Sequence, residues 1–216
     1  EGPGGGGLHA QAGGLREGVK MNERLKKSRD IADWIASKFD GIGVVRDGRS
    51  EFAATCYYVV WQHQAAVSRL YQEGLIAPAT ALLRCAWDAY IRGMWLSRAA
   101  GDEAVAAFLA GGSPPPQKEI VAALEVADEL PPDILSAFHR AHYSELCDLT
   151  HTGIAQLLQQ WNDEEICARQ EPEQVESILE FVDSIALSSL AQAAVMANEQ
   201  LIAHEALERM SAIRRR

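Results

Sequence analysis

The sequence has few of the features that mark secreted or membrane-spanning proteins. Its 216 residues include only four cysteines, at positions 56, 85, 147 and 167, and no two of them are closely spaced. A disulfide framework is therefore not expected. No run of about 18 uncharged apolar residues is present, the length that a bilayer requires, and the first residues do not resemble a secretory signal. These absences favour a reduced, cytoplasmic protein without a membrane partner.

Basic residues are also scarce. The chain has 20 lysines and arginines against 30 aspartates and glutamates, for a net charge of −10. Sequence-independent binding to double-stranded DNA needs a broad basic surface, so this function is not expected, although a local basic groove remains compatible with the composition. Hydrophobic residues make up 48% of the chain, so a folded core is expected.

The sequence does contain helical periodicity along most of its length. Residues 1–20 are glycine-rich and without periodicity, and are predicted to be a disordered tag or linker. From Met21 onward the apolar spacing predicts helices, with no alternation of strand and helix. The expected structure is therefore a single all-α domain over residues 21–216.

The predicted architecture is a helical bundle built on a long antiparallel hairpin. The two helices of the hairpin are expected at about 50–73 and 77–100. A helical pair at about 117–143, set off by a glycine- and proline-rich break, is expected as an insertion. A single long helix is predicted from about residue 172 to residue 210, and its apolar positions indicate that it packs closely on its neighbours.

The helix expected from residue 77 carries charge on an otherwise apolar surface. Arg84, Asp88 and Arg92 lie one turn apart on one face at about 100° per residue. A helix that is apolar on most sides is central, and a guanidinium there must be paired or used. Two interpretations remain open. The residues form a structural ion-pair ladder, or they form the floor of a pocket in which Arg84 or Arg92 binds an anion.

A second group of polar residues follows between positions 139 and 151. His139 and His142 lie one turn apart, and His151 shares a face with Cys147 if the helix continues that far. Asp148 is then placed to orient the His151 imidazole. The spacing matches no standard zinc pattern, so no metal and no other cofactor is predicted. A histidine held in the core or at its boundary is the simpler interpretation of His151.

The motifs of several enzyme classes are missing. The sequence has no phosphate loop, dinucleotide fingerprint or nucleophile elbow, and no Glu-x-x-His pair for a di-iron site. Tyr57, Tyr58 and Trp61 are expected in the core. A regulator that binds an effector in an apolar pocket near Tyr57, Trp61 and Trp95 is an alternative.

Two short segments carry a family resemblance. Residues 81–84 (Ala-Leu-Leu-Arg) and 88–96 (Asp-Ala-Tyr-Ile-Arg-Gly-Met-Trp-Leu) are followed much later by residues 150–153 (Thr-His-Thr-Gly). This pattern resembles bacterial helical families of unknown function that are similar to HEPN-like domains. The resemblance covers most of the chain from Phe52 to Trp161.

The resemblance implies an all-α fold, usually dimeric, of a kind often found in toxin–antitoxin and phage-defence systems. Active HEPN-like members are metal-independent ribonucleases that pair an arginine with a histidine slightly more than one turn later on the same helix. Here Tyr90, not a histidine, stands at that reach after Arg84. The implied site is therefore rearranged, with Arg84 stabilising the phosphorane charge and His151 approaching from another helix as the general base.

The leading prediction is a cytoplasmic HEPN-like homodimer that acts in stress or defence. It is expected to bind an anionic ligand, a nucleotide or RNA, in a polar pocket between helices. Catalysis, if it occurs, is assigned to Arg84 and His151, and whether the protein is an enzyme is left open. The alternative is a non-catalytic dimeric interaction module in which the Arg/Asp/His network is structural. The predicted ligand-binding residues are Arg84, Asp88, Tyr90, Arg92, His142, Asp148 and His151.

Overall fold

The computed structural model describes residues 7–127, 133–161, 165–166 and 170–213. In these residues every regular element is helical, apart from one isolated bridge between Trp161 and Ile166, so the all-α prediction is confirmed. The elements are α1 (Gly7–Phe39), α2 (Gly48–Gln72), α3 (Ile76–Met94), α4 (Asp102–Leu109), α5 (Gln117–Ala127), α6 (Ile134–Thr150), α7 (Ile154–Leu158), α8 (Pro172–Met196) and α9 (Gln200–Ile213).

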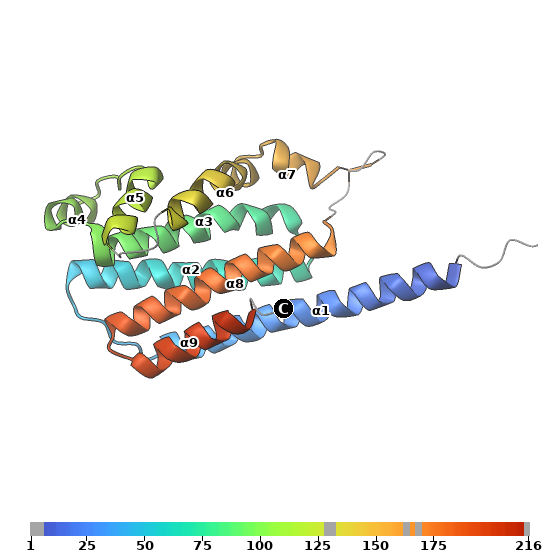
Figure 1. Cartoon of the computed structure of the whole chain (residues 1–216), viewed down its shortest axis with the longest axis horizontal. Helices are drawn as coiled ribbons and strands as arrows, with labels where there is room; N and C mark the ends of the chain where they lie inside the picture. The colour runs from blue at the N-terminus through green and yellow to red at the C-terminus, as the bar shows by residue number, and fades with distance from the viewer. Residues whose placement is uncertain (1–6, 128–132, 162–164, 167–169, 214–216) are drawn as a thin grey trace, which may run out of the picture.

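The long helices form the body of the molecule and the shorter ones cover one side of it. Helices α1, α2, α8 and α9 run alongside one another, while α4 to α7 lie over α3 (Figure 1). Helix α3 thus packs against α2 and α8 on one side and against α5 and α6 on the other. A π-helical turn, Trp95–Ala99, continues α3 directly. This central position of α3 agrees with its nearly all-round apolar sequence.

Helices α2 and α3 are consecutive and pack along their lengths. The Asp47 side chain accepts a hydrogen bond from the Ser50 backbone N–H at the start of α2, and the turn after Gln72 contains Gly74 with φ +71°. The two helices approach closely at Gly93, where an added Cβ would lie 2.7 Å from the Tyr57 ring. A glycine is required here because any larger side chain would push the helices apart.

Helix α1 begins at Gly7, earlier than the periodicity predicted. Residues 7–20, which were expected to belong to a disordered tag or linker, continue the helix that was predicted from Met21. Propagation adds one backbone hydrogen bond per residue to an existing helix. Between the glycines, this segment contains helix-favouring residues such as Ala10, Leu15 and Glu17.

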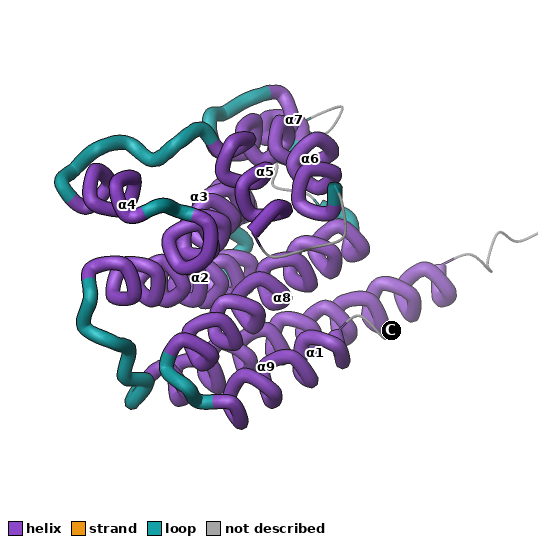
Figure 2. Tube along the Cα trace, turned by 60° about the vertical axis from the view of Figure 1, so that its left-hand side comes forward, coloured by secondary structure: helices purple, strands orange, loops and turns teal. Residues whose placement is uncertain are grey.

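The helix predicted from about residue 172 to residue 210 is in fact two antiparallel helices. Helix α8 ends at Met196, and α9 turns back along it toward α1 (Figure 2). The break lies at Asn198, whose φ is +60°. Asparagine tolerates this left-handed conformation better than other non-glycine residues and commonly follows a helix C-terminus. The prediction of one continuous helix was wrong because it did not weigh this signal.

Helix α8 is central among the long helices, because it packs against α1, α2, α3 and α9. By length and hydropathy it is a candidate membrane span, although 61% of its most apolar 18-residue window is buried inside the bundle. The core helix of a water-soluble bundle meets the same criteria.

The segment predicted as an insertion is continuous with the core. Helix α6 continues past the expected end of the pair, through Ser144, and ends at Thr150. Its residues Leu146 and Leu149 are buried, as are Ile120 and Leu124 of α5. Both helices therefore complete the core over α3 rather than extending from it.

Candidate functional site

Arg84 and His151 meet, although 67 positions separate them in sequence. Arg84 Nη1 lies 2.5 Å from His151 Nε2. Arg84 projects from the middle of α3, and His151 is the residue that ends α6. Thr150 holds the end of α6 against α3, because its hydroxyl donates to the Ala81 carbonyl at 3.2 Å. The tertiary fold thus brings together the two residues assigned to catalysis.

The contact defines which His151 nitrogen carries the proton. A guanidinium has only N–H donors and no acceptor. His151 Nε2 must therefore accept from Arg84, which places the imidazole proton on Nδ1. His151 is exposed, and the Arg84 side chain retains 23% of its accessible surface, so solvent can reach both groups.

Asp88 and Tyr143 hold the Arg84 guanidinium from the other sides. Arg84 Nε lies 3.4 Å from Asp88 Oδ2, one turn along α3, as the sequence predicted. The Tyr143 ring of α6 lies under the guanidinium at 5.4 Å, a cation–π distance. Desolvation opposes the charged form of Arg84, but interactions with Tyr143, Cys147 and Asp88 raise its pKa overall. Burial raises the pKa of Asp88, against the effects of Arg84 and Arg92.

Several polar atoms of this cluster are buried without a hydrogen-bond partner in the described part of the chain. They are Arg84 Nε, Asp88 Oδ1, Arg92 Nε and His139 Nδ1. His139 stacks on Tyr143 with ring centroids 4.4 Å apart, and burial lowers the pKa of His139. Buried polar groups in native proteins are nearly always satisfied. These atoms are polar groups of the cluster that a bound polar ligand would meet.

Three of the predicted ligand-binding residues lie elsewhere. The Tyr90 hydroxyl hydrogen-bonds to Ser188 of α8 at 2.8 Å, and the His142 ring packs against Phe138. The Asp148 side chain lies against Gly153, just after the end of α6. Tyr90 thus projects toward α8, and α6 ends at Thr150, before His151. Arg92 lies near Asp88 and also near Cys56 of α2, where its charge acts on the thiol.

The apolar pocket expected near Tyr57, Trp61 and Trp95 does not form at these residues. Tyr57 has no exposed surface and bonds to Ser97, and Trp61 donates to the Ala32 carbonyl at 2.8 Å. Trp95 is buried against Phe108. All three aromatic side chains therefore contribute to the core, which was the simpler of the two interpretations of the sequence.

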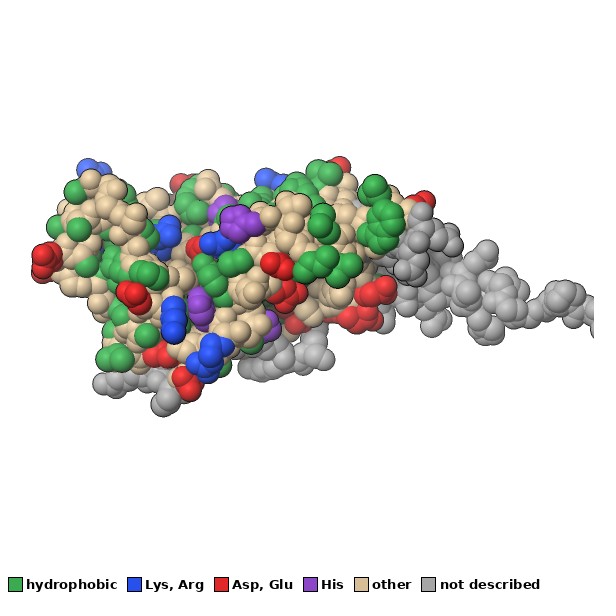
Figure 3. All heavy atoms as spheres, turned by 90° about the horizontal axis from the view of Figure 1, so that it is seen from above, with side chains coloured by type: hydrophobic (Ala, Val, Ile, Leu, Met, Phe, Trp, Pro, Cys, Tyr) green, Lys and Arg blue, Asp and Glu red, His purple; other side chains and the backbone are tan. Residues whose placement is uncertain are grey.

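Metal-ligating and thiol groups do not gather in the described residues. No set of three or more His, Cys, Asp or Glu side chains is placed there to hold a metal ion. Cys56, Cys85 and Cys147 are free thiols, while Cys167 lies outside the described residues. Viewed onto the face that carries α4 to α7, basic and histidine side chains lie next to each other near its middle (Figure 3).

A second buried polar cluster, around Asp183, was not predicted from the sequence. Asp183 of α8 has no exposed surface and accepts hydrogen bonds from Arg24 at 2.9 Å, Ser28 at 2.6 Å and Gln64 at 2.7 Å. Burial raises the pKa of Asp183, against the effect of these three donors. The cluster links α1, α2 and α8. Its signal in the sequence is a carboxylate in the middle of an apolar helix, because a buried carboxylate needs hydrogen-bond partners.

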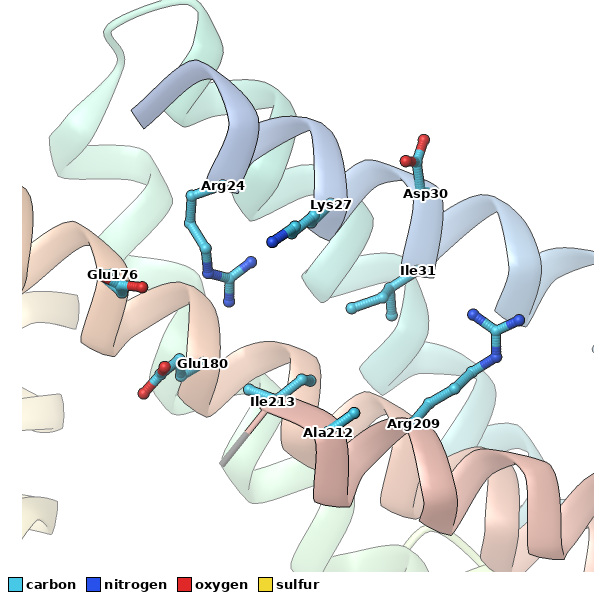
Figure 4. A pocket seen from close by; sticks show the side chains of 9 residues that line it. All are labelled: Arg24, Lys27, Asp30, Ile31, Glu176, Glu180, Arg209, Ala212 and Ile213. Atoms are coloured by element: carbon cyan, nitrogen blue, oxygen red, sulfur yellow. The ribbon is translucent and has the colours of Figure 1, made fainter. Parts of the chain in front are cut away.

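A hollow of about 310 Å³ lies next to this cluster, between α1, α8 and α9. In Figure 4, Arg24 points from α1 toward α8, Arg209 reaches from α9 toward α1, and Asp30 points away from the space between them. The Arg209 guanidinium stacks over Trp34 at 4.2 Å, and Arg24 is paired with Asp183. Arg24 therefore joins α1 to α8, and Arg209 joins α9 to α1.

A model of one protein family matches residues 57–214. The chain belongs to this family, a family of unknown function (DUF6988). The DUF6988 match includes Arg84, Asp88, His151 and Asp183, but not the part of α1 that supplies Arg24. No curated protein and no solved structure matches the chain.

Proposed function

We propose that this DUF6988 protein is a HEPN-like helical domain that binds a phosphate-bearing ligand, a nucleotide or RNA, between Arg84 and His151. The proposed setting is a cytoplasmic stress or defence response, which the resemblance to HEPN-like domains suggests. The observation that carries the proposal is the contact between these two side chains, which come from helices far apart in sequence.

The chemistry of the pair suits a phosphate. Arg84 has further N–H groups that match two phosphate oxygens, and Tyr143 and Asp88 fix its orientation. A phosphate entering the site would replace His151 as the acceptor of an Arg84 hydrogen bond. The lone pair on His151 Nε2 would then be free to accept a hydrogen bond from a ligand hydroxyl.

RNA cleavage is the reaction that this pair would support. His151 Nε2 would take the proton from a ribose 2′-hydroxyl, whose oxygen forms a bond to phosphorus. The bond from phosphorus to the 5′-oxygen breaks, and that oxygen takes a proton from solvent, leaving a 2′,3′-cyclic phosphate and a 5′-hydroxyl. Arg84 would stabilise the extra negative charge on the phosphorane.

A non-catalytic, dimeric interaction module is the competing function. The observation that favours it is the 3.4 Å ion pair of Arg84 with Asp88, because an internal partner reduces the charge available to a ligand.

Binding is tested with a short 5′-phosphorylated single-stranded RNA and a fluorescent ATP analogue, measured by anisotropy. Loss of a charge-assisted hydrogen bond weakens binding by about 10-fold or more. We therefore expect at least that loss for Arg84→Ala, a smaller loss for His151→Ala because its neutral imidazole forms a weaker hydrogen bond, and a partial loss for Arg84→Lys. The matched controls are Arg140→Ala, exposed on α6, and His204→Ala, exposed on α9, which should change affinity less than about twofold. Equal affinity in all five proteins and the wild type would exclude the site.

Catalysis is tested separately with an internally labelled RNA. The wild type should release fragments that end in a cyclic phosphate, and both Arg84→Ala and His151→Ala should lose that activity. If the wild type binds the RNA tightly but all three proteins cleave it only at the background rate, the site binds RNA and the nuclease is excluded.

A further inference from the structure

A second hollow, of about 660 Å³, lies between α3, α6 and α8. It is lined by Trp87 and Tyr90 of α3, Phe138 of α6 and Phe181 of α8, and not by Arg84 or His151. We propose that it binds a small amphipathic organic anion with an aromatic body. This proposal is independent of the phosphate site.

The wall of the hollow is built to contact flat rings. Phe138 and Phe181 are nearly parallel, with 9° between their planes and centroids 5.4 Å apart. The ring centroids of Trp87 and Phe138 are 4.3 Å apart, and those of Tyr90 and Trp87 are 6.2 Å apart. Offset and tilted rings at these separations are favourable contacts for a further aromatic group. The volume is within the range of small-molecule sites, which form preferentially between the helices of bundles.

An unpaired donor supports a ligand that carries an acceptor. Trp87 is only 4% exposed, and its indole N–H has no hydrogen-bond acceptor among the described residues. A buried tryptophan N–H usually has a partner, and an exception calls for an explanation such as a bound molecule or water.

Polar groups define the two ends of the hollow. At one end Arg98 hydrogen-bonds to Gln192, one helical turn beyond the Tyr90–Ser188 bond. That turn is about 6 Å long, so an aromatic body beside Tyr90 places its acidic group near the Arg98 charge. Glu180 lies at the opposite end and repels an anion there. These charges orient a bound anion with its acidic group toward Arg98 and away from Glu180.

The test uses two fluorescent probes of nearly the same shape. 1-Anilinonaphthalene-8-sulfonate carries an anionic group, and N-phenyl-1-naphthylamine carries none. We expect saturable, one-to-one binding of both to the folded wild type, with quenching of tryptophan fluorescence. Arg98→Gln should weaken the sulfonate at least about fivefold and change the uncharged probe by less than about twofold.

Blocking variants test the location of the site. Ser184→Phe adds a ring to the α8 wall and should weaken both probes about tenfold or more. Ser37→Phe adds the same ring to the exposed face of α1 and should have no effect. Ser177→Phe, at the more exposed rim of the hollow, serves if Ser184→Phe does not fold. Thermal unfolding checks that each variant is folded.

Unchanged affinity in every folded blocking variant would overturn the proposed location. Equal weakening of the two probes by Arg98→Gln would overturn the anion preference, because a structural disturbance affects both probes alike. No saturable binding of either probe by the folded wild type would overturn the site altogether.

Discussion

The guanidinium of Arg24 lies 2.9 Å from the carboxylate of Asp183, although 159 positions separate them. Arg24 comes from α1 and Asp183 from the middle of α8, so this contact joins the first helix to the buried helix α8. Gln64 of α2 completes the arrangement by donating to both Asp183 and Ser28. Neither of the two proposed ligand sites includes Arg24 or Asp183.

Asp183→Ala should strongly destabilise the fold. The change leaves the buried Arg24 charge without its partner, a kind of loss that costs about 3–5 kcal/mol. We expect a decrease of that size in the free energy of unfolding, measured by urea titration. Glu176→Ala, an exposed acidic residue on the same helix, should change it by less than about 0.5 kcal/mol. Equal effects of the two substitutions would contradict a stabilising role for the cluster.

Gly93→Ala should destabilise the packing of α2 on α3. The added Cβ would lie 2.7 and 2.9 Å from two carbons of the fully buried Tyr57 ring, and 3.2 Å from the Cβ of Cys56. Overpacking of this kind costs about 1–3 kcal/mol. In Gly43→Ala the added methyl meets nothing within 4 Å, and stability should hardly change. The comparison uses thermal melts of both variants, and a stable Gly93→Ala protein would show that Tyr57 can move.

The free energy of unfolding should fall as the pH drops below about 6.5. Burial lowers the pKa of both His63 and His139 in the folded state, so the unfolded chain binds protons first in that window. The stabilisation linked to these two neutral histidines is therefore present above pH 6.5 and is lost as the pH falls through their pKa values in the folded state. The double variant His63→Gln, His139→Gln should show a smaller change in the free energy of unfolding over this pH range, measured by urea titration at each pH. His204→Gln, exposed on α9, should leave the profile as it is.

The protein should have a solution mass of about twice 23.6 kDa, as the resemblance to HEPN-like domains suggests. The segment around α7 exposes a row of large apolar side chains that a second copy of the chain would cover. They are Ile154 at 64%, Leu157 at 50%, Leu158 at 64% and Trp161 at 55% exposure.

Leu158→Glu tests that surface by light scattering after gel filtration. A charge in the interface should shift the mass toward that of a single chain. Leu201→Glu, equally apolar and 80% exposed on α9, is the control and should not shift it. A single-chain mass for the wild type would exclude the dimer.

Periodicity along the chain was sufficient to predict the fold class and the central helix. The 3.6-residue spacing reports which face of a helix is apolar, so the all-α fold, the central α3 and the Arg84–Asp88 pair could all be predicted. Local breaks were harder to weigh. Asn198 ends α8 through a left-handed backbone conformation, and α6 ends at His151 rather than running through it.

Distances between helices are not encoded in any one helix. The sequence by itself determined that Arg84 lies on a mostly apolar helix and must find partners there. Only the tertiary structure decided that His151 is one of them, that Tyr90 faces Ser188 instead, and that Asp183 pairs with Arg24. The physical reason is that side-chain period fixes a direction around one helix axis, whereas neighbours across a bundle are chosen by the packing of all the helices together.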